Sequence, residues 1–382
     1  MTELNEKKIA LNYIYLSKHH SGGKDQVGLN LLKGLYENGM TKQMVVICYP
    51  FSVDTIRKIA PDIRIITVKG KGGGSELKRM FQVSMTNTFQ IPKVVKKHGI
   101  EVMYHLSYNN GLRKQPAKTV MVPHDIKQIA HRKLANVTVP WYKYILYRIM
   151  YGLDYRHNDK IVAISEFDKN EMYQYYGKYK DKIIRIYNPV CAEQREIVTE
   201  KEPFIMAMNL QFHHKNIITL LKAYEKIMDK ITENLYLVGN VPERVSYLKE
   251  YVKEHHMEER VIFTGFVSDE QVVEMLSRTR LYVNPTLFEG FGMPAVEAMI
   301  YGAPTLLSGI PANREVTKGL VDYYEPPEDD TTLANAILQA LANSVSGEKL
   351  KKNANAMLKA YHYQKIAEEY YRLFLNMVGK KK

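Results

Sequence analysis

Cysteine is scarce in this chain of 382 residues, which contains only Cys48 and Cys191. The two lie far apart in the sequence and do not have the spacing of metal ligands. This scarcity argues against a disulfide framework and indicates a reducing compartment.

Long apolar runs are missing as well. Charged and polar residues interrupt the first twenty positions, so the apolar core of a signal peptide is not recognisable there. No uninterrupted apolar stretch approaches the roughly 20 residues that a membrane-spanning helix needs. We therefore expect a cytoplasmic protein, or one bound peripherally to the inner face of the cell membrane.

Motifs of several other enzyme classes are absent. No G-x-G-x-x-G follows the first predicted strand, which argues against a dinucleotide-dependent oxidoreductase, and the glycine-rich segment 68–78 lacks the Gly-Lys-Ser/Thr ending of a phosphate loop. The adjacent histidine pairs at 19–20, 213–214 and 255–256 do not have the spacing of helical metal ligands. We therefore expect no metal site.

Acidic residues are sparse in the first half of the chain. Residues 1–190 contain 31 Lys and Arg but 15 Asp and Glu, a net charge of +16, whereas residues 191–382 have a net charge of −3. This asymmetry indicates that the first half meets something anionic. Nucleic acid and acidic lipid are both candidates, and a basic face kept only for solubility is a third.

Short β-branched runs alternate with amphipathic stretches along the whole chain. The alternation predicts an α/β protein with parallel sheets covered by helices, and the length suits two domains. Ligands of such sheets bind outside the carboxyl ends of the strands. The predicted strands are KIALNYIYL, QMVVICY, IRIITV, EVMYHL, KTVMV, KIVAI, PFIMAM, NLYLVG, RVIFTG, RLYVNP and APTLLS.

The stretch FEGFGMPAVEAM, residues 288–299, follows one of these strands. Pro294 suits the first turn of a helix, and glycine at 292 lets the backbone approach a ligand. Free N–H groups of Gly292, Met293 and Ala295 at the positive end of that helix predict a phosphate site.

Three charged side chains suit the same ligand. Glu297 lies one turn into the predicted helix, where a carboxylate can accept hydrogen bonds from a ribose diol, and Glu289 can reach a sugar beyond the phosphates. Lys215 follows the strand PFIMAM and precedes a helix, where a phosphate partner belongs. A solvated helix glutamate, an unrelated loop glutamate and a surface lysine are the alternatives.

In the first half, two further sites follow predicted strands. Gly22 and Gly23 would let the backbone approach a diphosphate, although a structural turn explains them equally well. His124 directly follows the strand KTVMV. Ser165, followed by Glu166 and an amphipathic run, indicates a helix N-cap.

The stretch NPTLFEGFGMPAVEAMIYGAPTLLS resembles the signature of the retaining GT-B glycosyltransferases of family 4, in which seven residues separate two glutamates. The similarity extends through FIMAMNLQFHHKNIITLLKAYEKI, LYLVGN, RVIFTGFVSDEQVVEMLSRTRLYVNP and KIVAISEFDKNEMYQYYG. It implies two Rossmann-like domains whose parallel sheets face each other across a cleft. The acceptor-binding domain would be 1–188 with a returning C-terminal helix at 361–382, and the nucleotide-sugar domain 189–360.

The resemblance also implies a role for each site residue. Glu297 would bind the ribose, Glu289 the donor sugar and Lys215 the leaving diphosphate. The backbone of Phe291, Gly292 and Met293 would lie along the sugar and diphosphate, with Gly22 and Gly23 against the diphosphate-sugar and His124 near the reacting carbon.

One position departs from the family pattern. Asn209-Leu210 stands where Gly-Arg is usual, so that a second cation for the diphosphate is missing unless His213 or His214 replaces it.

The implied function is transfer of a sugar from a nucleoside diphosphate sugar to a glycan or lipid-linked acceptor hydroxyl, with retention, in bacterial-type surface polysaccharide or glycolipid synthesis. No cofactor is expected, and the absence of Asp-x-Asp argues against the metal-dependent GT-A class. A nucleotide-sugar epimerase on the same fold is the alternative enzyme. A nucleic-acid-binding protein would explain the basic half but not the glutamate pair, so we expect no nucleic-acid partner.

The stretch RKLANVTVPWYKYILYRIMYGLDYRH mixes aromatic and basic residues in the positive half. Such a helix suits an anionic membrane interface. An amphipathic helix packed on the core explains the same pattern.

Overall fold

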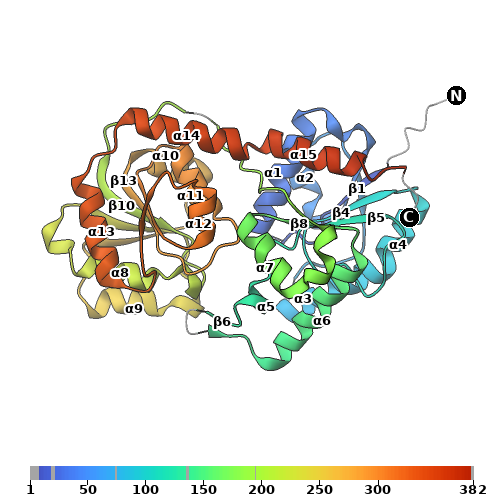
Figure 1. The fold of residues 1–382 in the computed structure, drawn as a ribbon, viewed down its shortest axis with the longest axis horizontal. Helices are drawn as coiled ribbons and strands as arrows, with labels where there is room; N and C mark the ends of the chain where they lie inside the picture. The colour runs from blue at the N-terminus through green and yellow to red at the C-terminus, as the bar shows by residue number, and fades with distance from the viewer. Residues whose placement is uncertain (1–7, 19–21, 74, 135–136, 194, 380–382) are drawn as a thin grey trace. The chain divides into compact units, whose positions relative to one another are not determined.

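The computed structural model describes residues 8–18, 22–73, 75–134, 137–193 and 195–379. The chain divides into two compact units (Figure 1). The first unit contains residues up to Arg132, Val139–Cys191 and the chain from Tyr361 onward, and the second contains Lys133–Thr138 and Ala192–Ala360. The predicted boundary between residues 188 and 189 lies a few residues before the change of unit after Cys191.

A seven-stranded parallel sheet forms the centre of the first unit, with the strand order β3-β2-β1-β4-β5-β8-β9. The order reverses between β1 and β4, and doubly wound sheets bind ligands at the carboxyl ends of the strands beside such a reversal. The strands are β1 (Ile9–Asn12), β2 (Met44–Cys48), β3 (Arg64–Thr67), β4 (Val102–His105), β5 (Lys118–Met121), β8 (Lys160–Ala163) and β9 (Ile183–Arg185).

Helices cover both faces of this sheet (Figure 1). They are α1 (Gly23–Glu37), α2 (Val53–Ile59), α3 (Glu76–Met85), α4 (Ile91–Lys97), α5 (Lys127–Ala130), α6 (Trp141–His157), α7 (Glu166–Tyr176) and α15 (Tyr363–Leu375). The C-terminal helix α15 packs on α1 and on the sheet. Tyr104 of β4 meets Tyr370 and Phe374 of α15 at ring-centroid distances of 5.6 and 5.9 Å. The expected return of the last helix to the first domain is therefore confirmed.

A six-stranded parallel sheet of order β12-β11-β10-β13-β14-β15 forms the centre of the second unit. Its strands are β10 (Glu202–Met208), β11 (Asn234–Val238), β12 (Val261–Gly265), β13 (Thr279–Asn284), β14 (Thr305–Ser308) and β15 (Asp322–Tyr324). Its helices are α8 (Ile217–Glu225), α9 (Tyr247–Glu254), α10 (Asp269–Arg278), α11 (Met293–Ile300), α12 (Pro311–Val316), α13 (Asp330–Ala342) and α14 (Gly347–Tyr361).

The central strand β10 is apolar on both sides, which explains why helices cover both faces of the second sheet. Ile205 and Ala207 pack with buried residues of α8, α9 and α13. Phe204 and Met206 pack with buried residues of α10 and α11. Side chains alternate across a strand, so each face of β10 contributes to a separate core.

All eleven strands predicted from the sequence are present, and both sheets are parallel as predicted. The sequence did not predict β9 and β15, or the two-residue antiparallel pair β6 (Lys133–Leu134) and β7 (Val137–Thr138). Among the described residues, no helix has both the length and the apolar character needed to cross a membrane.

Candidate active site

The turn between β13 and α11 contains the glutamate-rich stretch. Gly292 caps α11 with φ +89° and ψ +49°, a left-handed conformation that favours glycine. Pro294 lies in the first turn of α11, as predicted, and the helix ends at Ile300, close to Gly302 at φ +77°.

Two of the three predicted anion-binding amides have no hydrogen-bond partner in the described part of the chain. The N–H groups of Gly292 and Met293 make no hydrogen bond to another described residue. The prediction for Ala295 was wrong, because its N–H donates to the Gly292 carbonyl at 3.1 Å. The first turn of α11 closes tightly with this bond between residues three apart.

Polar contacts fix the loop after β13 to the loop after β10. The N–H of Leu287 donates to the His214 carbonyl at 2.8 Å. Asn216, at φ +58°, donates from Nδ2 to the Pro285 carbonyl at 3.1 Å. Lys215 lies between the two anchored residues, so its backbone is held against the glutamate loop.

Lys215 and Glu289 form an ion pair. Lys215 Nζ lies 2.5 Å from Glu289 Oε1, and the two side chains are only 13% and 11% exposed. The structure thus brings together two predicted site residues that are 74 positions apart in the sequence. Because both side chains are largely shielded from water, the attraction between their charges is screened less than in an exposed ion pair.

Glu297 lies one turn into α11 and is partly exposed. Burial raises the pKa of its carboxyl to about 7, and the negative charge of Asp269 adds to this effect. Within the described part of the chain, the Glu297 carboxylate has no hydrogen-bond or ion-pair partner. The side chains of Phe291 and Met293 are buried, so these two residues can face a ligand beside Glu297 only with their backbone.

Asn313, on α12, lies behind the glycine cap and was not predicted. A Cβ atom added at Gly292 would lie 3.5 Å from Asn313 Oδ1 and 3.8 Å from Glu289 Cγ. Asn313 Nδ2 donates to the Ser308 carbonyl at 2.9 Å, whereas its buried Oδ1 has no hydrogen-bond partner among the described residues. The side chain that lines the cap is therefore held by β14.

Leu210 supplies no cation to this site. It is 1% exposed in the core of the second unit, and Asn209 before it has a left-handed φ of +65°. A positively charged side chain from another connection contacts the loop after β10. Arg244, in the connection between β11 and α9, donates from Nε to the Gln211 carbonyl at 2.6 Å, and its guanidinium lies 4.5 Å from the centre of the Phe212 ring.

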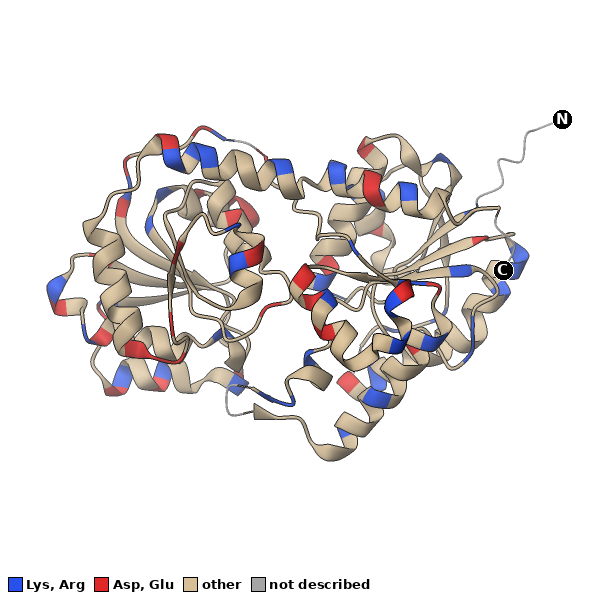
Figure 2. Ribbon diagram, in the orientation of Figure 1, with Lys and Arg blue, Asp and Glu red and all other residues tan. Residues whose placement is uncertain are grey.

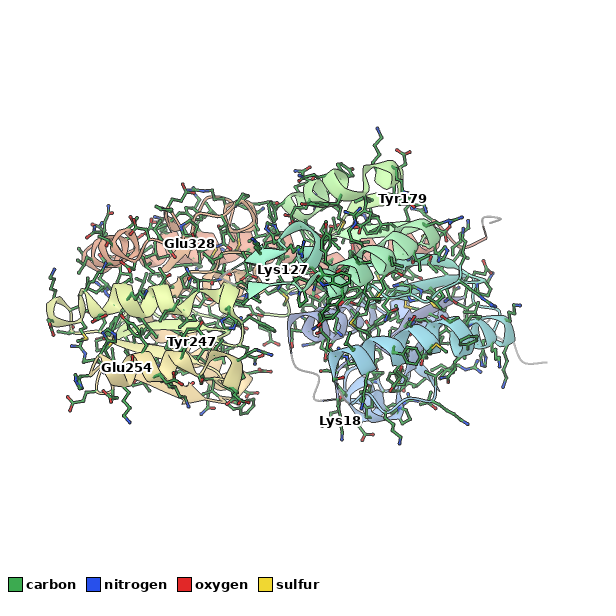
Figure 3. All side chains as sticks on the ribbon, turned by 90° about the horizontal axis from the view of Figure 1, so that it is seen from below. Lys18, Lys127, Tyr179, Tyr247, Glu254 and Glu328 are labelled. Carbon is green, nitrogen blue, oxygen red and sulfur yellow. The ribbon has the colours of Figure 1, made fainter. Side chains whose placement is uncertain are left out.

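His213 is turned toward α9. Its Nδ1 lies 3.2 Å from the hydroxyl of Tyr247, and the two rings stack with centroids 5.5 Å apart. Tyr247 is labelled in Figure 3. Arg244 is thus a better candidate than His213 for the second cation, and its place after the strand NLYLVG is the only sequence signal that indicated it.

In the first unit, the Gly-Gly turn lies at the start of α1. Gly22 has φ +103°, Gly23 begins the helix, and a Cβ atom added at either would meet open space. Lys24, which was not predicted as a site residue, donates from Nζ to the Tyr15 carbonyl and lies 3.3 Å from Asp25 Oδ1. Burial lowers the pKa of Lys24 to about 8.

His124 lies three positions after the end of β5 and has a left-handed φ of +71°. Its Nε2 lies 2.7 Å from the Leu106 carbonyl, which can only accept, so Nε2 bears the proton and Nδ1 is left as an acceptor. Burial lowers the pKa of His124 to about 4, and the charges of Lys24 and Asp25 also act on it. The structure therefore places a neutral imidazole near the start of α1.

Ser165 is a helix cap, as predicted. Its hydroxyl accepts a hydrogen bond from the N–H of Asp168 at 3.0 Å. Glu166 forms ion pairs with Lys169 and Arg185 at 3.0 and 2.8 Å. The contacts of Ser165 and Glu166 thus stabilise the start of α7.

Among the described residues, no group of three His, Cys, Asp or Glu side chains is placed to hold a metal ion. The histidines at 19 and 20 lie outside these residues.

Two family models match consecutive parts of the chain. Residues 21–194 match the model of glycosyltransferase family 4, and residues 192–357 match that of glycosyl transferases group 1. The first match contains every strand of the first sheet except β1, and the second contains every strand of the second sheet.

Two curated relatives and one solved structure illustrate the similarity. The serotype-specific mannosyltransferase WbdA of Escherichia coli is 26% identical over 269 residues, which are 66% of this chain and 32% of WbdA. The N-acetyl-alpha-D-glucosaminyl L-malate synthase of Bacillus anthracis is 23% identical over 385 residues, 94% of each chain. The structure of HepE from Anabaena in complex with UDP-glucose has a TM-score of 0.70 at 16% identity and covers 97% of this chain and 99% of HepE.

The chain spans about a third of the length of WbdA. The similarity to HepE concerns the fold, which is the same over nearly the whole of both chains. Two doubly wound parallel sheets, the glutamate pair and both family models agree, and the chain belongs to the GT-B glycosyltransferases of the family 4 type.

Proposed function

We propose that this protein transfers a hexosyl or deoxyhexosyl group from a nucleoside diphosphate sugar to an acceptor hydroxyl. The observation that carries the proposal is the Lys215–Glu289 ion pair beside the N–H groups of Gly292 and Met293, which have no hydrogen-bond partner among the described residues. A cation, two helix-terminal N–H groups and a carboxylate together match a diphosphate that is joined to a sugar.

Each of these groups has a defined task in donor binding. The diphosphate would bind Lys215 and the start of α11, and Arg244 would supply a second positive charge. Glu289, released from Lys215 by the incoming phosphate, would accept hydrogen bonds from the donor sugar. Glu297 would accept them from the ribose.

During transfer, the bond between the anomeric carbon and the phosphate oxygen breaks, and its electron pair leaves with the diphosphate. The acceptor oxygen bonds to the same face of that carbon, and its proton passes to the released diphosphate. The positive groups stabilise the charge that develops on the leaving group. We expect retention of configuration, with no cofactor and no added metal ion.

The acceptor would be a hydroxyl of a growing surface glycan or of a lipid-linked sugar, and the reaction would take place on the cytoplasmic side. WbdA is a serotype-specific mannosyltransferase, which makes mannosyl donors the first to test. UDP-glucose follows because HepE binds it in a fold of the same kind.

Calorimetric titration of the full chain with UDP, dTDP and GDP tests the donor site. We expect one of them to bind, and Lys215→Ala to raise its Kd at least about tenfold, because a charge-assisted contact is lost. Lys226→Ala is the matched control, since Lys226 also contacts a carboxylate of the second unit, Asp330, but is exposed. No binding of any nucleotide, or equal effects of both variants, would contradict the proposal.

A further inference from the structure

Helix α6 is apolar on two opposite faces. Its inner face contains Tyr147, Tyr151 and Tyr155, which are at most 5% exposed and belong to the core of the first unit. A helix that packs on a core with one face ordinarily presents polar residues on the other. Packing on the core therefore accounts for the aromatic residues of the inner face of α6, but not for the apolar residues of its outer face.

The outer face of α6 carries five exposed apolar side chains. We call them the outer stripe: Trp141, Tyr142, Ile145, Leu146 and Ile149, with exposed fractions between 39% and 67%. At about 100° per residue, these positions fall within an arc of about 140°, opposite the buried tyrosines. The stripe is thus a continuous surface along the first half of the helix.

Basic side chains border the outer stripe. On the same helical projection, Lys143 lies at one edge and Arg148 at the other. Arg156 is exposed near the end of the helix. Figure 2 shows α6 mostly in tan, with blue bands of Lys and Arg. An apolar strip edged by cations, with Trp and Tyr at one end, has the composition of a helix that lies in a membrane interface.

The neighbouring helix α3 contacts α6 and has exposed apolar side chains of its own. Glu76 at its start lies 3.7 Å from Lys143 Nζ and accepts a hydrogen bond from the Tyr147 hydroxyl at 3.1 Å. Leu77 and Phe81, one turn apart on α3, are 45% and 68% exposed. Two adjacent helices therefore expose bulky apolar side chains.

We propose that the outer stripe of α6 binds the surface of an anionic lipid bilayer. The charge of the chain favours this occupant over a second copy of the protein. Residues 1–190 have a net charge of +16, so two copies joined through this face would bring like charges together, whereas anionic headgroups would neutralise them. The proposal goes beyond the transferase function and does not depend on the identity of the donor.

The chain provides its own probe, because Trp141 in the outer stripe is its only tryptophan. We expect vesicles of phosphatidylcholine with about one third phosphatidylglycerol to shift the Trp141 emission to shorter wavelength and to sediment with the protein. Phosphatidylcholine vesicles should do neither, and salt should weaken the binding because it screens the headgroup charge.

Variants distinguish membrane binding by the outer stripe from attraction by the overall positive charge of the first half of the chain. Ile145→Ser with Ile149→Ser should weaken binding to anionic vesicles at least about tenfold, and Arg148→Gln about fivefold. Leu375→Ser, at an apolar residue of α15 that is 42% exposed, is the control and should leave binding unchanged. Nucleotide affinity, measured in parallel, should be the same in all variants.

Three results would overturn the proposal. They are the absence of binding to anionic vesicles, binding that the double variant retains, and a blue shift without lipid that accompanies formation of a dimer in light scattering. A failure of nucleotide binding alone would affect the proposed transferase function and leave this one standing.

Discussion

Lys215 and Glu289 show how two residues from different loops become one site. Removal of either charge alone would leave the other poorly solvated, since the side chains are only 13% and 11% exposed. We expect Lys215→Met and Glu289→Gln each to lower the free energy of unfolding by about 1–3 kcal/mol. The double variant should lose clearly less than the sum.

Urea unfolding of the four proteins, followed by circular dichroism, measures this coupling. A coupling energy near zero would show that the ion pair does not persist in solution. The Lys226–Asp330 pair, which is more exposed, provides the comparison and should show little coupling.

Glu297 should make donor binding depend on pH. Burial raises its pKa to about 7, so most of its carboxyl is protonated at pH 6 and ionised at pH 8. The ionised carboxylate accepts hydrogen bonds from both ribose hydroxyls, and these charge-assisted bonds are stronger than those of the protonated acid. Affinity for a nucleotide sugar should therefore rise from pH 6 to pH 8, by up to about tenfold.

A nucleotide sugar is the right ligand for this titration, because its phosphates do not titrate in that range. Glu297→Gln should bind more weakly at pH 8 and show a flatter pH profile. An unchanged profile in Glu297→Gln would assign the pH dependence to another group.

At the residue scale, local sequence context indicated part of the site. Glu289, Gly292 and Glu297 lie within one short stretch, where proline, glycine and spacing predict a helix start. Arg244 and Asn313 come from other loops and join the site through tertiary packing. The sequence indicated Arg244 only by its place after the strand NLYLVG, and nothing in it marked Asn313. Leu210 is buried directly after a left-handed turn at Asn209, and the sequence revealed neither feature.

At the scale of elements, the cap of α11 gives a direct test of the anion site. Gly292→Ala would place a methyl group between Glu289 and Asn313 and would impose a left-handed φ on alanine, at a cost of about 1–2 kcal/mol. Gly39→Ala is the matched control, since Gly39 has φ +68° and open space around its Cα.

We expect both glycine variants to lower thermal stability by a similar amount. Only Gly292→Ala should weaken nucleotide binding, by about fivefold or more, because the added methyl group lies beside the phosphate-binding amides. Equal nucleotide affinity in the two variants would place the anion elsewhere.

The sequence predicted strands in the interior of the sheets better than those at the edges. Interior strands such as β2 and β10 are buried on both faces and read as apolar runs. The edge strands β9 and β15 have only three residues each and include polar positions. The sequence pattern of helix α6 did not predict which of its faces packs on the core, because both faces carry aromatic residues.

At the scale of the whole molecule, the two units repeat one plan. Each has a parallel sheet whose strand order reverses beside its first strand, and in each the predicted site residues follow the strands. The resemblance to family 4 predicted this architecture, which the family models and the fold of HepE support. The charge asymmetry between the halves, by contrast, was compatible with nucleic acid, with acidic lipid and with a basic face that serves only solubility. The exposed apolar surface of α6 favours acidic lipid among these.

The transferase activity can be measured as release of nucleoside diphosphate from UDP-, dTDP- and GDP-sugars, with and without a membrane lipid extract as acceptor source. We expect acceptor-dependent release from one donor, abolished in both Lys215→Ala and Glu297→Ala and retained in Lys226→Ala. Release that survives in both site variants, or clear nucleotide binding without release from any donor in the presence of acceptor, would contradict the proposed transferase function.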